Sequence, residues 1–323
     1  MKKYPIKFNK IFVEKIWGGR DFEKALGMQL PDDKLYGESW ELSVLKNGSS
    51  TIVNGEYQGK KLFELLEEHK SELVGEKIYA RYGNQFPLLI KYLDINDKLS
   101  VQVHPNDGYA LKHENSFGKA ECWYIMSASH DAKLIFGLKE GVTKEEFVSK
   151  VSQNEFAGIF NEVRVQKGDF IYVEPGMVHA TVQGSILIAE IQQSSDVTYR
   201  IYDFDRADAG GNKRALHIKE SANVINFNLK NMNEKIQKSL DMKNGKLLDT
   251  EYFSVEKCTV EHKKSFKAKE SFQILSVLDG KSIVECGNEK VALSVGETML
   301  IPAKIPFEVV GNIAFLNSYI RCE

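Results

Sequence analysis

Short stretches that alternate apolar and polar residues dominate the chain. Residues 99–104, Leu-Ser-Val-Gln-Val-His, have the two-residue period of a strand. Similar β-branched and aromatic runs cover residues 133–136, 170–173 and 186–192, and Gly, Asn and Asp separate them. Many short strands with close turn signals favour a sandwich or a barrel, so the pattern predicts a mainly β fold.

A few predicted helices interrupt these strands. Residues 60–73 carry leucines at helical spacing with a polar opposite face, which is typical of an amphipathic helix. Thr143 and Glu146 have the spacing of a capping box that opens a short helix, and Ser152 with Glu155 predicts a second start of this kind.

A change of composition indicates where the chain divides into domains. Residues 228–238 are polar and rich in Lys and Asn, and strand patterns resume at Tyr252. We therefore predict a first domain of residues 1–240 with helical segments and a second, smaller β domain of residues 241–323.

A short internal repeat supports two related barrels. Residues 165–179 align with residues 293–306 when one residue is removed. In each copy a Gly and an acidic residue make a turn, an apolar strand follows, and a Pro starts the next turn. His179 of the first copy falls on Pro306 of the second, which cannot bind a metal. The first barrel is therefore expected to carry the chemistry, and the second is expected to be structural.

Composition and charge exclude several classes of function. Of the 323 residues, 42% are hydrophobic and 27% charged, which is typical of a globular protein with a real core. The formal net charge of −2 gives no general electrostatic case for nucleic acid or membrane binding. We expect no signal peptide, and no apolar run approaches the roughly 18 residues of a membrane helix. Four scattered cysteines predict a reduced cytoplasmic protein.

Four residues have the chemistry of a metal site. Gln102 and His104 lie two apart on one predicted strand, so both side chains leave the same face. Glu121 follows on the next element, and His179 comes after a Pro-Gly turn. Two imidazoles, a carboxylate and an amide suit a first-row divalent metal inside a small barrel. The alternative from spacing alone is a hydrogen-bonded polar interior without metal.

A second polar cluster begins with Glu190, which shares a strand face with Gln192. If the following segment is extended, Asp196, Thr198 and Arg200 also face one way. Asp196 and Arg200 could form an ion pair at a sheet edge. Alternatively, Arg200 could face an anionic substrate or a developing oxyanion, which its fork and permanent charge suit.

Two further residues have either a functional or a structural interpretation. Lys119 lies two residues before Glu121, so both side chains point into the same space, where the amine could shuttle protons or hold a phosphate. Trp17 stands beside two glycines, where it could form a wall for a sugar ring or simply pack in the core.

Several separated segments resemble type I mannose-6-phosphate isomerases, in the same order from about Trp17 to Arg206. They are residues 17–19 (Trp-Gly-Gly), 37–43 (Gly-Glu-Ser-Trp-Glu-Leu-Ser), 87–94 (Pro-Leu-Leu-Ile-Lys-Tyr-Leu-Asp), 99–107 (Leu-Ser-Val-Gln-Val-His-Pro-Asn-Asp), 118–124 (Gly-Lys-Ala-Glu-Cys-Trp-Tyr), 174–180 (Glu-Pro-Gly-Met-Val-His-Ala) and 196–203 (Asp-Val-Thr-Tyr-Arg-Ile-Tyr-Asp). The length is that of the short bacterial form. The resemblance implies a cupin barrel that carries the metal site, with a few helices, and a second degenerate cupin-like β domain without one.

The same resemblance implies a function. It is that of a zinc-dependent aldose–ketose isomerase, which interconverts D-mannose 6-phosphate and D-fructose 6-phosphate through a cis-enediol. One Zn²⁺ per chain would be bound by Gln102, His104, Glu121 and His179. The remaining alternatives are a non-catalytic cupin that binds sugar phosphates and an Fe(II) cupin oxygenase, since two His and a carboxylate also suit iron.

The resemblance also assigns the catalytic positions. The catalytic arginine falls on Arg200, while Lys119, Glu190 and Asp196 match other active-site positions. These three are the candidates for the proton-transfer base, and Glu190 is preferred. Trp17, Lys119 and Arg200 are expected to contact the substrate. The sequence leaves open which of Lys119, Arg200 and Arg206 holds the phosphate. The sequence leaves the oligomeric state open.

Overall fold

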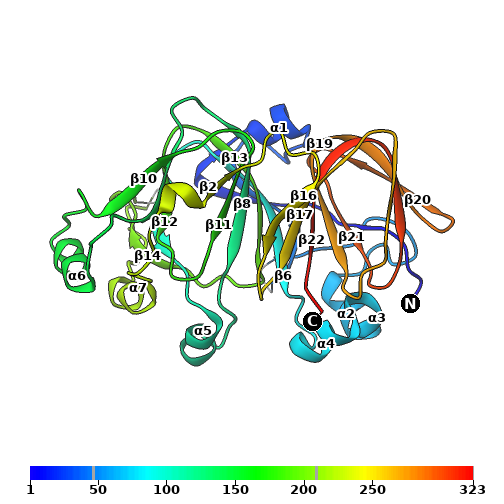
Figure 1. The fold of residues 1–323 in the computed structure, drawn as a ribbon, viewed down its shortest axis with the longest axis horizontal. Helices are drawn as coiled ribbons and strands as arrows, with labels where there is room; N and C mark the ends of the chain where they lie inside the picture. Colours follow the sequence, from blue (N-terminus) through cyan, green and yellow to red (C-terminus); the bar gives the residue numbers. More distant parts are fainter. Residues whose placement is uncertain (46–47, 208–209, 323) are drawn as a thin grey trace. The chain divides into compact units, whose positions relative to one another are not determined.

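The structure is a computed structural model that describes residues 1–45, 48–207 and 210–322. The chain forms two compact units. We call residues 15–19 and 93–240 the central unit, and residues 1–14, 20–92 and 241–323 the terminal unit. Strands β2 (Ile11–Gly19) and β6 (Leu88–Ile95) carry the chain from one unit to the other (Figure 1).

The unit boundary after residue 240 coincides with the predicted start of the second domain. Residues 1–14 and 20–92, however, group with the C-terminal segment and not with the strands that follow them. The division into a catalytic domain of residues 1–240 and a second domain of residues 241–323 therefore stays a prediction.

Two sheets build the central unit. One has the strand order β10-β9-β12-β7-β14, and in the other β15, β11, β8 and β13 are successive neighbours. The elements are β7 (Val101–Val103), α5 (Asp107–His113), β8 (Glu121–Ala128), β9 (Lys133–Leu138), α6 (Lys144–Ser152), β10 (Phe160–Arg164), β11 (Asp169–Val173), β12 (His179–Gln183), β13 (Ile186–Gln193), β14 (Tyr199–Tyr202), α7 (Ile218–Val224), a 3₁₀ turn (Met232–Lys235) and β15 (Ile236–Lys238).

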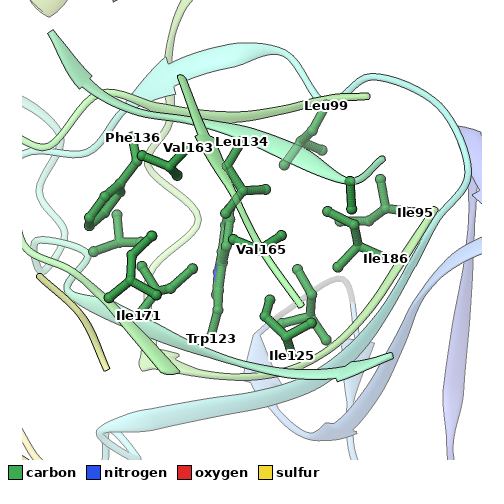
Figure 2. Packing of buried hydrophobic residues seen from close by; sticks show 14 of the residues in the cluster. Ile95, Leu99, Trp123, Ile125, Leu134, Phe136, Val163, Val165, Ile171 and Ile186 are labelled. Atoms are coloured by element: carbon green, nitrogen blue, oxygen red, sulfur yellow. The ribbon is translucent and has the colours of Figure 1, made fainter. Parts of the chain in front are cut away.

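Apolar side chains of both sheets fill the space between them. Trp123 lies opposite Ile171 in the β8–β11 ladder, and both belong to one buried cluster with Leu134 and Phe136 from β9. Figure 2 shows these side chains pointing toward one another. Since successive residues of a strand face opposite sides, the odd-numbered residues of β8 must face this interior.

Helices cover the other face of the five-stranded sheet. Ile135, Ala180 and Ile201 pack in a second cluster with Phe147 of α6 and Ala222 of α7, and both helices lie beside this sheet in Figure 1. The sheet is therefore buried on both faces, which fixes its register.

The helix predictions had mixed outcomes. The hydroxyl of Thr143 accepts a hydrogen bond from the Glu146 amide, so the predicted cap of α6 is confirmed. The predicted start at Ser152 is wrong, because this residue ends α6. The single helix predicted over residues 60–73 is interrupted at Lys70, whose φ of 46° separates two shorter helices.

The terminal unit contains the second barrel. Its eight-stranded sheet has the order β1-β21-β19-β22-β17-β16, with β18 on β22 and β20 on β19. The elements are β1 (Ile6–Lys7), α1 (Asp21–Leu26), β3 (Tyr36–Leu42), β4 (Val44–Leu45), β5 (Gly48–Ser49), α2 (Leu62–His69), α3 (Ser71–Val74), α4 (Glu76–Tyr82), β16 (Gly245–Asp249), β17 (Ser254–Val260), β18 (Lys263–Phe266), β19 (Gln273–Cys286), β20 (Glu289–Ser294), β21 (Thr298–Ile301) and β22 (Phe307–Tyr319).

The two copies of the sequence repeat have matching local structures. Gly168 and Gly296 have φ values of 86° and 75°, a region that favours glycine, and each stands shortly before a strand, β11 or β21. The mainly β fold predicted from the sequence is confirmed. Within the described residues, no helix has the length and hydropathy needed to cross a membrane.

Candidate metal centre

Three neighbouring strands place polar side chains in one row on the inner face of the five-stranded sheet. His179 on β12 lies opposite Gln102 on β7, which in turn lies opposite Arg200 on β14. Directly paired residues of adjacent strands point to the same side of a sheet. His104 follows Gln102 by two residues and leaves that face as well.

Glu121 reaches the same interior from the second sheet. It lies two residues before the buried Trp123 on β8 and therefore shares its inward face. One ligand atom from each of His104, Glu121 and His179 lies within 4.8 Å of the other two, and all three residues are buried. The structure thus brings together three of the four predicted ligands.

The backbone fixes both imidazoles in one orientation. Nδ1 of His104 lies 2.9 Å from the carbonyl oxygen of Val197, and Nδ1 of His179 lies 3.0 Å from that of Met177. A carbonyl oxygen only accepts, so each Nδ1 carries the hydrogen. Both Nε2 atoms are then left as lone-pair donors that face Glu121, at 3.6 Å from Oε2 for His104 and 3.2 Å from Oε1 for His179. Metal-ligating histidines are held in this way in proteins.

The electrostatics of the site favour neutral imidazole and ionised carboxylate. Burial lowers the pKa of His104 well below its usual range, and the charge of Lys119 acts in the same direction. Burial alone would raise the pKa of Glu121, but the positive charge of Lys119 and the neighbouring imidazoles hold it well below its usual range. These are the protonation states that metal binding requires.

The donor set fits a divalent cation. Oε1 of Glu121 is buried and has no hydrogen-bond partner within the part of the chain that the structure describes. A cation shared with the two Nε2 atoms would satisfy it, and nitrogen with carboxylate oxygen is a common zinc set with open positions. Gln102 borders this centre, because its Nε2 lies 3.2 Å from Nε2 of His179. Rotating its amide would present the oxygen to the centre instead.

Lys119 lies beside the ligands as predicted. Its Nζ donates to Oε2 of Glu121 at 2.6 Å and to Nε2 of His104 at 3.1 Å. The backbone amide of Lys119 donates to the Pro105 carbonyl. Gly118 permits this close approach, since a Cβ there would lie 2.5 Å from backbone atoms of Asn106 and Asp107.

Glu190 is buried on β13, opposite Trp123. The indole Nε1 of Trp123 donates to Oε1 of Glu190 at 2.9 Å, and its ring packs edge-on against His179 with centroids 5.5 Å apart. Trp123 was not among the predicted site residues. Its position two residues after Glu121 placed it on the same face and could have revealed it.

Arg200 is half-buried at the end of the polar row. Its Nη1 donates to the Ala215 carbonyl at 3.1 Å. Nε is buried and, among the described residues, has no hydrogen-bond partner. A guanidinium with an unused donor next to Gln102 is suited to bind an anionic group.

Comparisons with known proteins give the family of this chain. Residues 6–119 match the catalytic domain of type I phosphomannose isomerase, and residues 243–320 match the mannose-6-phosphate isomerase cupin domain. The mannose-6-phosphate isomerase of Streptococcus mutans is 40% identical over 308 residues, which are 95% of each chain. The mannose-6-phosphate isomerase ManA of Bacillus subtilis is 39% identical over 94% of each chain. The chain belongs to the type I mannose-6-phosphate isomerase family.

A solved structure agrees with this assignment. The crystal structure of the mannose 6-phosphate isomerase from Bacillus subtilis matches with a TM-score of 0.86 and 33% identity, covering 98% of this chain and 99% of that one. The predicted cupin fold and the isomerase class are thereby confirmed.

Two predicted site residues of this type I isomerase lie on the surface and in the apolar core. Asp196 is exposed, shortly before β14. Trp17 is 3% exposed and belongs to the same hydrophobic cluster as Trp123, so packing accounts for its burial. The catalytic role of Asp196 and the sugar contact of Trp17 stay predictions.

Proposed function

We propose that this chain is a zinc-dependent isomerase that interconverts D-mannose 6-phosphate and D-fructose 6-phosphate through a cis-enediol. The observation that carries the proposal is the convergence of two oriented imidazoles on Glu121, one of whose oxygens lacks a hydrogen bond. His104, Glu121 and His179 would hold one Zn²⁺ per chain, with Gln102 as the fourth ligand. When bound, zinc would act as a Lewis acid toward the sugar oxygens.

The reaction moves a proton between C2 and C1 of the open-chain sugar. We assign the transfer to Glu190, because it is buried and the Trp123 indole holds one of its oxygens at 2.9 Å. It would take the proton from C2 and return it to C1, while negative charge builds on the oxygens in between. Asp196 is a weaker candidate for this base because it is exposed.

Two cationic side chains complete the chemistry. Arg200 would stabilise the charge on the enediolate oxygen, an effect that is largest in a site that excludes water. Lys119 would carry a proton from the oxygen on C2 to the oxygen on C1. This transfer is needed because the C1 aldehyde becomes an alcohol while the C2 alcohol becomes a ketone. Its contacts with Glu121 and His104 place the amine beside the metal ligands.

Chelation and reconstitution test this proposal. The purified chain is dialysed against EDTA, and fructose 6-phosphate conversion to mannose 6-phosphate is followed in a coupled assay before and after zinc is added. We expect activity to disappear and return. Full activity in the metal-free protein rejects the zinc role, and no activity with any metal rejects the isomerase.

Matched variants separate ligands from other histidines. His104→Ala and His179→Ala should lose bound metal and activity together. His130 is exposed, so His130→Ala should keep both. Metal analysis of the same preparations distinguishes zinc from iron, and oxygen uptake would indicate the oxygenase alternative.

The location of this enzyme is part of the proposal. All four cysteines are free, and three of them are buried. A chain without disulfides fits the reducing cytoplasm.

A further inference from the structure

Two arginines share one buried carboxylate next to the polar row of His179, Gln102 and Arg200. Asp203 follows β14 and is 5% exposed. Its Oδ2 accepts a hydrogen bond from Nε of Arg214 at 2.7 Å, and its Oδ1 accepts one from Nη2 of Arg206 at 2.6 Å. Arg214 also donates to Oδ1 through Nη2. A single carboxylate therefore fixes two guanidinium groups in a defined orientation.

Arg200 lies beside Asp203, Arg206 and Arg214, and we call these four residues the arginine cluster. The segment that carries Arg214 runs alongside β14, because His217 and Arg200 exchange two hydrogen bonds, from the His217 amide to the Arg200 carbonyl at 2.7 Å and from the Arg200 amide to His217 Nδ1 at 3.2 Å. Ala215 accepts from the Arg200 side chain in addition. Arg214 thus stands one residue from a direct contact of Arg200.

The cluster has a surplus of positive charge. Three permanent cations, Arg200, Arg206 and Arg214, face the one buried carboxylate of Asp203. Around it, Lys98 stands over the Phe204 ring and the exposed Asp97 lies 3.8 Å from Arg206, so these two outer charges offset each other. Among the residues of this cluster that the structure describes, the cations therefore exceed the buried carboxylate by two charges, which matches the charge of a phosphate monoester near neutral pH.

The three arginines repel one another electrostatically. Burial lowers the pKa of Arg200, and the charges of Arg214 and Arg206 act in the same direction against the attraction of Asp203. A bound dianion would relieve this repulsion. Guanidinium groups bind phosphate through two parallel hydrogen bonds, which a point charge cannot do.

Exposure identifies the arginine that is free to bind. The Arg206 side chain is 15% exposed and is also bonded to the Lys98 carbonyl, so it anchors the loop. The Arg214 side chain is 39% exposed, while its other face is held by Asp203. The strand beside this segment also fits the substrate, since β14 lies two strand spacings, about 10 Å, from β12, which carries His179. A six-carbon sugar with its phosphate on carbon 6 needs a separation of this order between its two ends.

We propose that Arg214, oriented by Asp203 beside Arg200, binds the phosphate of the sugar phosphate and makes the enzyme select phosphorylated over unphosphorylated sugars. This inference rests on the proposed function. Arg206 and Asp203 are positioning residues in it. A loop that is merely held together by ion pairs would contain the same contacts, and the experiment is designed to distinguish the two.

The experiment compares Arg214→Gln with Lys213→Gln. Lys213 is the neighbouring cation, exposed and paired with Asp205 outside the cluster, so its variant removes one charge from the same loop and should leave activity unchanged. Initial rates with mannose 6-phosphate are measured in a phosphate-free buffer of low ionic strength, because salt screens exposed charges. Inorganic phosphate is added as a competitive inhibitor.

Arg214→Gln should raise KM by about 10- to 100-fold, the loss expected for a charge-assisted hydrogen-bond pair. Its kcat should stay within about threefold of the parent, since the group is remote from C1 and C2. Inhibition by inorganic phosphate should weaken by a similar factor. An unchanged KM, an equal effect of Lys213→Gln, or a loss confined to kcat would each overturn the proposal.

Two further measurements keep the test decisive. If Arg214→Gln melts at a much lower temperature than the parent, Arg214→Lys is used, which keeps the charge and should recover part of the phosphate affinity. If the parent chain lacks isomerase activity, the proposed function fails, but calorimetry with fructose 6-phosphate still tests the cluster. Weaker binding by Arg214→Gln than by Lys213→Gln then supports the anion site, and equal binding rejects it.

Discussion

The two barrels of this chain place different residues at one and the same ladder position. Glu121 lies opposite Val173 in the β8–β11 ladder of the central unit, and Gln273 lies opposite Ile301 in the corresponding β19–β21 ladder of the terminal unit. Glu121 keeps an oxygen without a hydrogen bond and faces two imidazoles. Gln273 instead accepts a hydrogen bond from the Asn317 amide at 2.9 Å.

The second difference concerns the next strand. β12 begins at His179, whereas β22 begins at Phe307, directly after Pro306. The inward carboxylate position thus carries an amide in the second barrel, where Gln273 and Asn317 pair with each other, and the position of the imidazole falls on the exposed Pro306. The comparison shows that the fold supplies the space and a few inward-facing side chains decide whether it becomes a metal site.

Replacing Glu121 by glutamine, the residue at the matching position of the second barrel, tests this difference most directly. Glu121→Gln removes the charge that binds the cation and should lower kcat/KM by on the order of 10³-fold or more, since a metal contributes several kcal/mol. Gln273→Ala, the matched change in the second barrel, should leave kcat/KM within about twofold. Zinc content and coupled rates measure both. A metal-bound, active Glu121→Gln would refute the assignment.

Loss of the guanidinium at the end of the polar row should have the next largest effect. Arg200→Ala should reduce kcat by about 10²- to 10³-fold, because a donor to the developing oxyanion acts mainly in the transition state. KM should change less. Steady-state kinetics with metal content as a control test this, and an unchanged kcat would remove Arg200 from the mechanism.

Acidification should weaken metal binding at the first barrel. Protons compete with the metal for both imidazoles, so affinity falls as pH decreases, by up to about tenfold per pH unit for each imidazole below its pKa. Burial lowers the pKa of His104. The loss of metal affinity that protonation of His104 causes should therefore begin at a pH below the ordinary value of about 6.5. Competition with a chromophoric chelator between pH 4 and 8 measures this. Constant affinity down to pH 4 contradicts the ligand set.

The smallest expected effect concerns the indole that holds Glu190. Trp123→Phe keeps the ring packing but removes the hydrogen bond to Oε1. We expect kcat to fall by about tenfold, within the range that general-base catalysis provides. Zinc content should not change. The pH profile of kcat should shift as well, because the carboxylate loses a donor, and an unaltered profile would separate Trp123 from the base.

Period-two spacing predicted which side chains share a strand face, while spacing alone left open whether they hold a metal. The two-residue separation of Gln102 and His104 predicted a shared face, and both side chains do lie beside His179. The same reasoning correctly placed Lys119 beside Glu121. The sequence could not predict that Val197 and Met177 carbonyls orient the imidazoles, since backbone acceptors leave no mark in residue types. The break at Lys70 was missed because the apolar spacing continues through it.

The cluster of Asp203 with Arg200, Arg206 and Arg214 could be predicted only in part from the sequence. Arg206 was considered for the phosphate, but Arg214 was not, because its contact with Asp203 depends on how the segment after β14 folds back. Trp17 and Asp196 had features that suited a site but occupy the core and the surface. Local patterns predict which way a side chain leaves a strand, and the path of the connecting loops decides what it meets.

Both ends of the chain contribute strands to the terminal unit, and this has a consequence for folding during synthesis. Ile6 and Lys7 of β1 pair with Leu300 and Met299 of β21, so a nascent chain carries this N-terminal strand unpaired until nearly all of the protein has left the ribosome. Residues 93–240 are contiguous and can collapse earlier. Premature termination before β21 would leave β1 without its partner strand, and an unpaired strand exposes backbone groups that chaperones and proteases recognise.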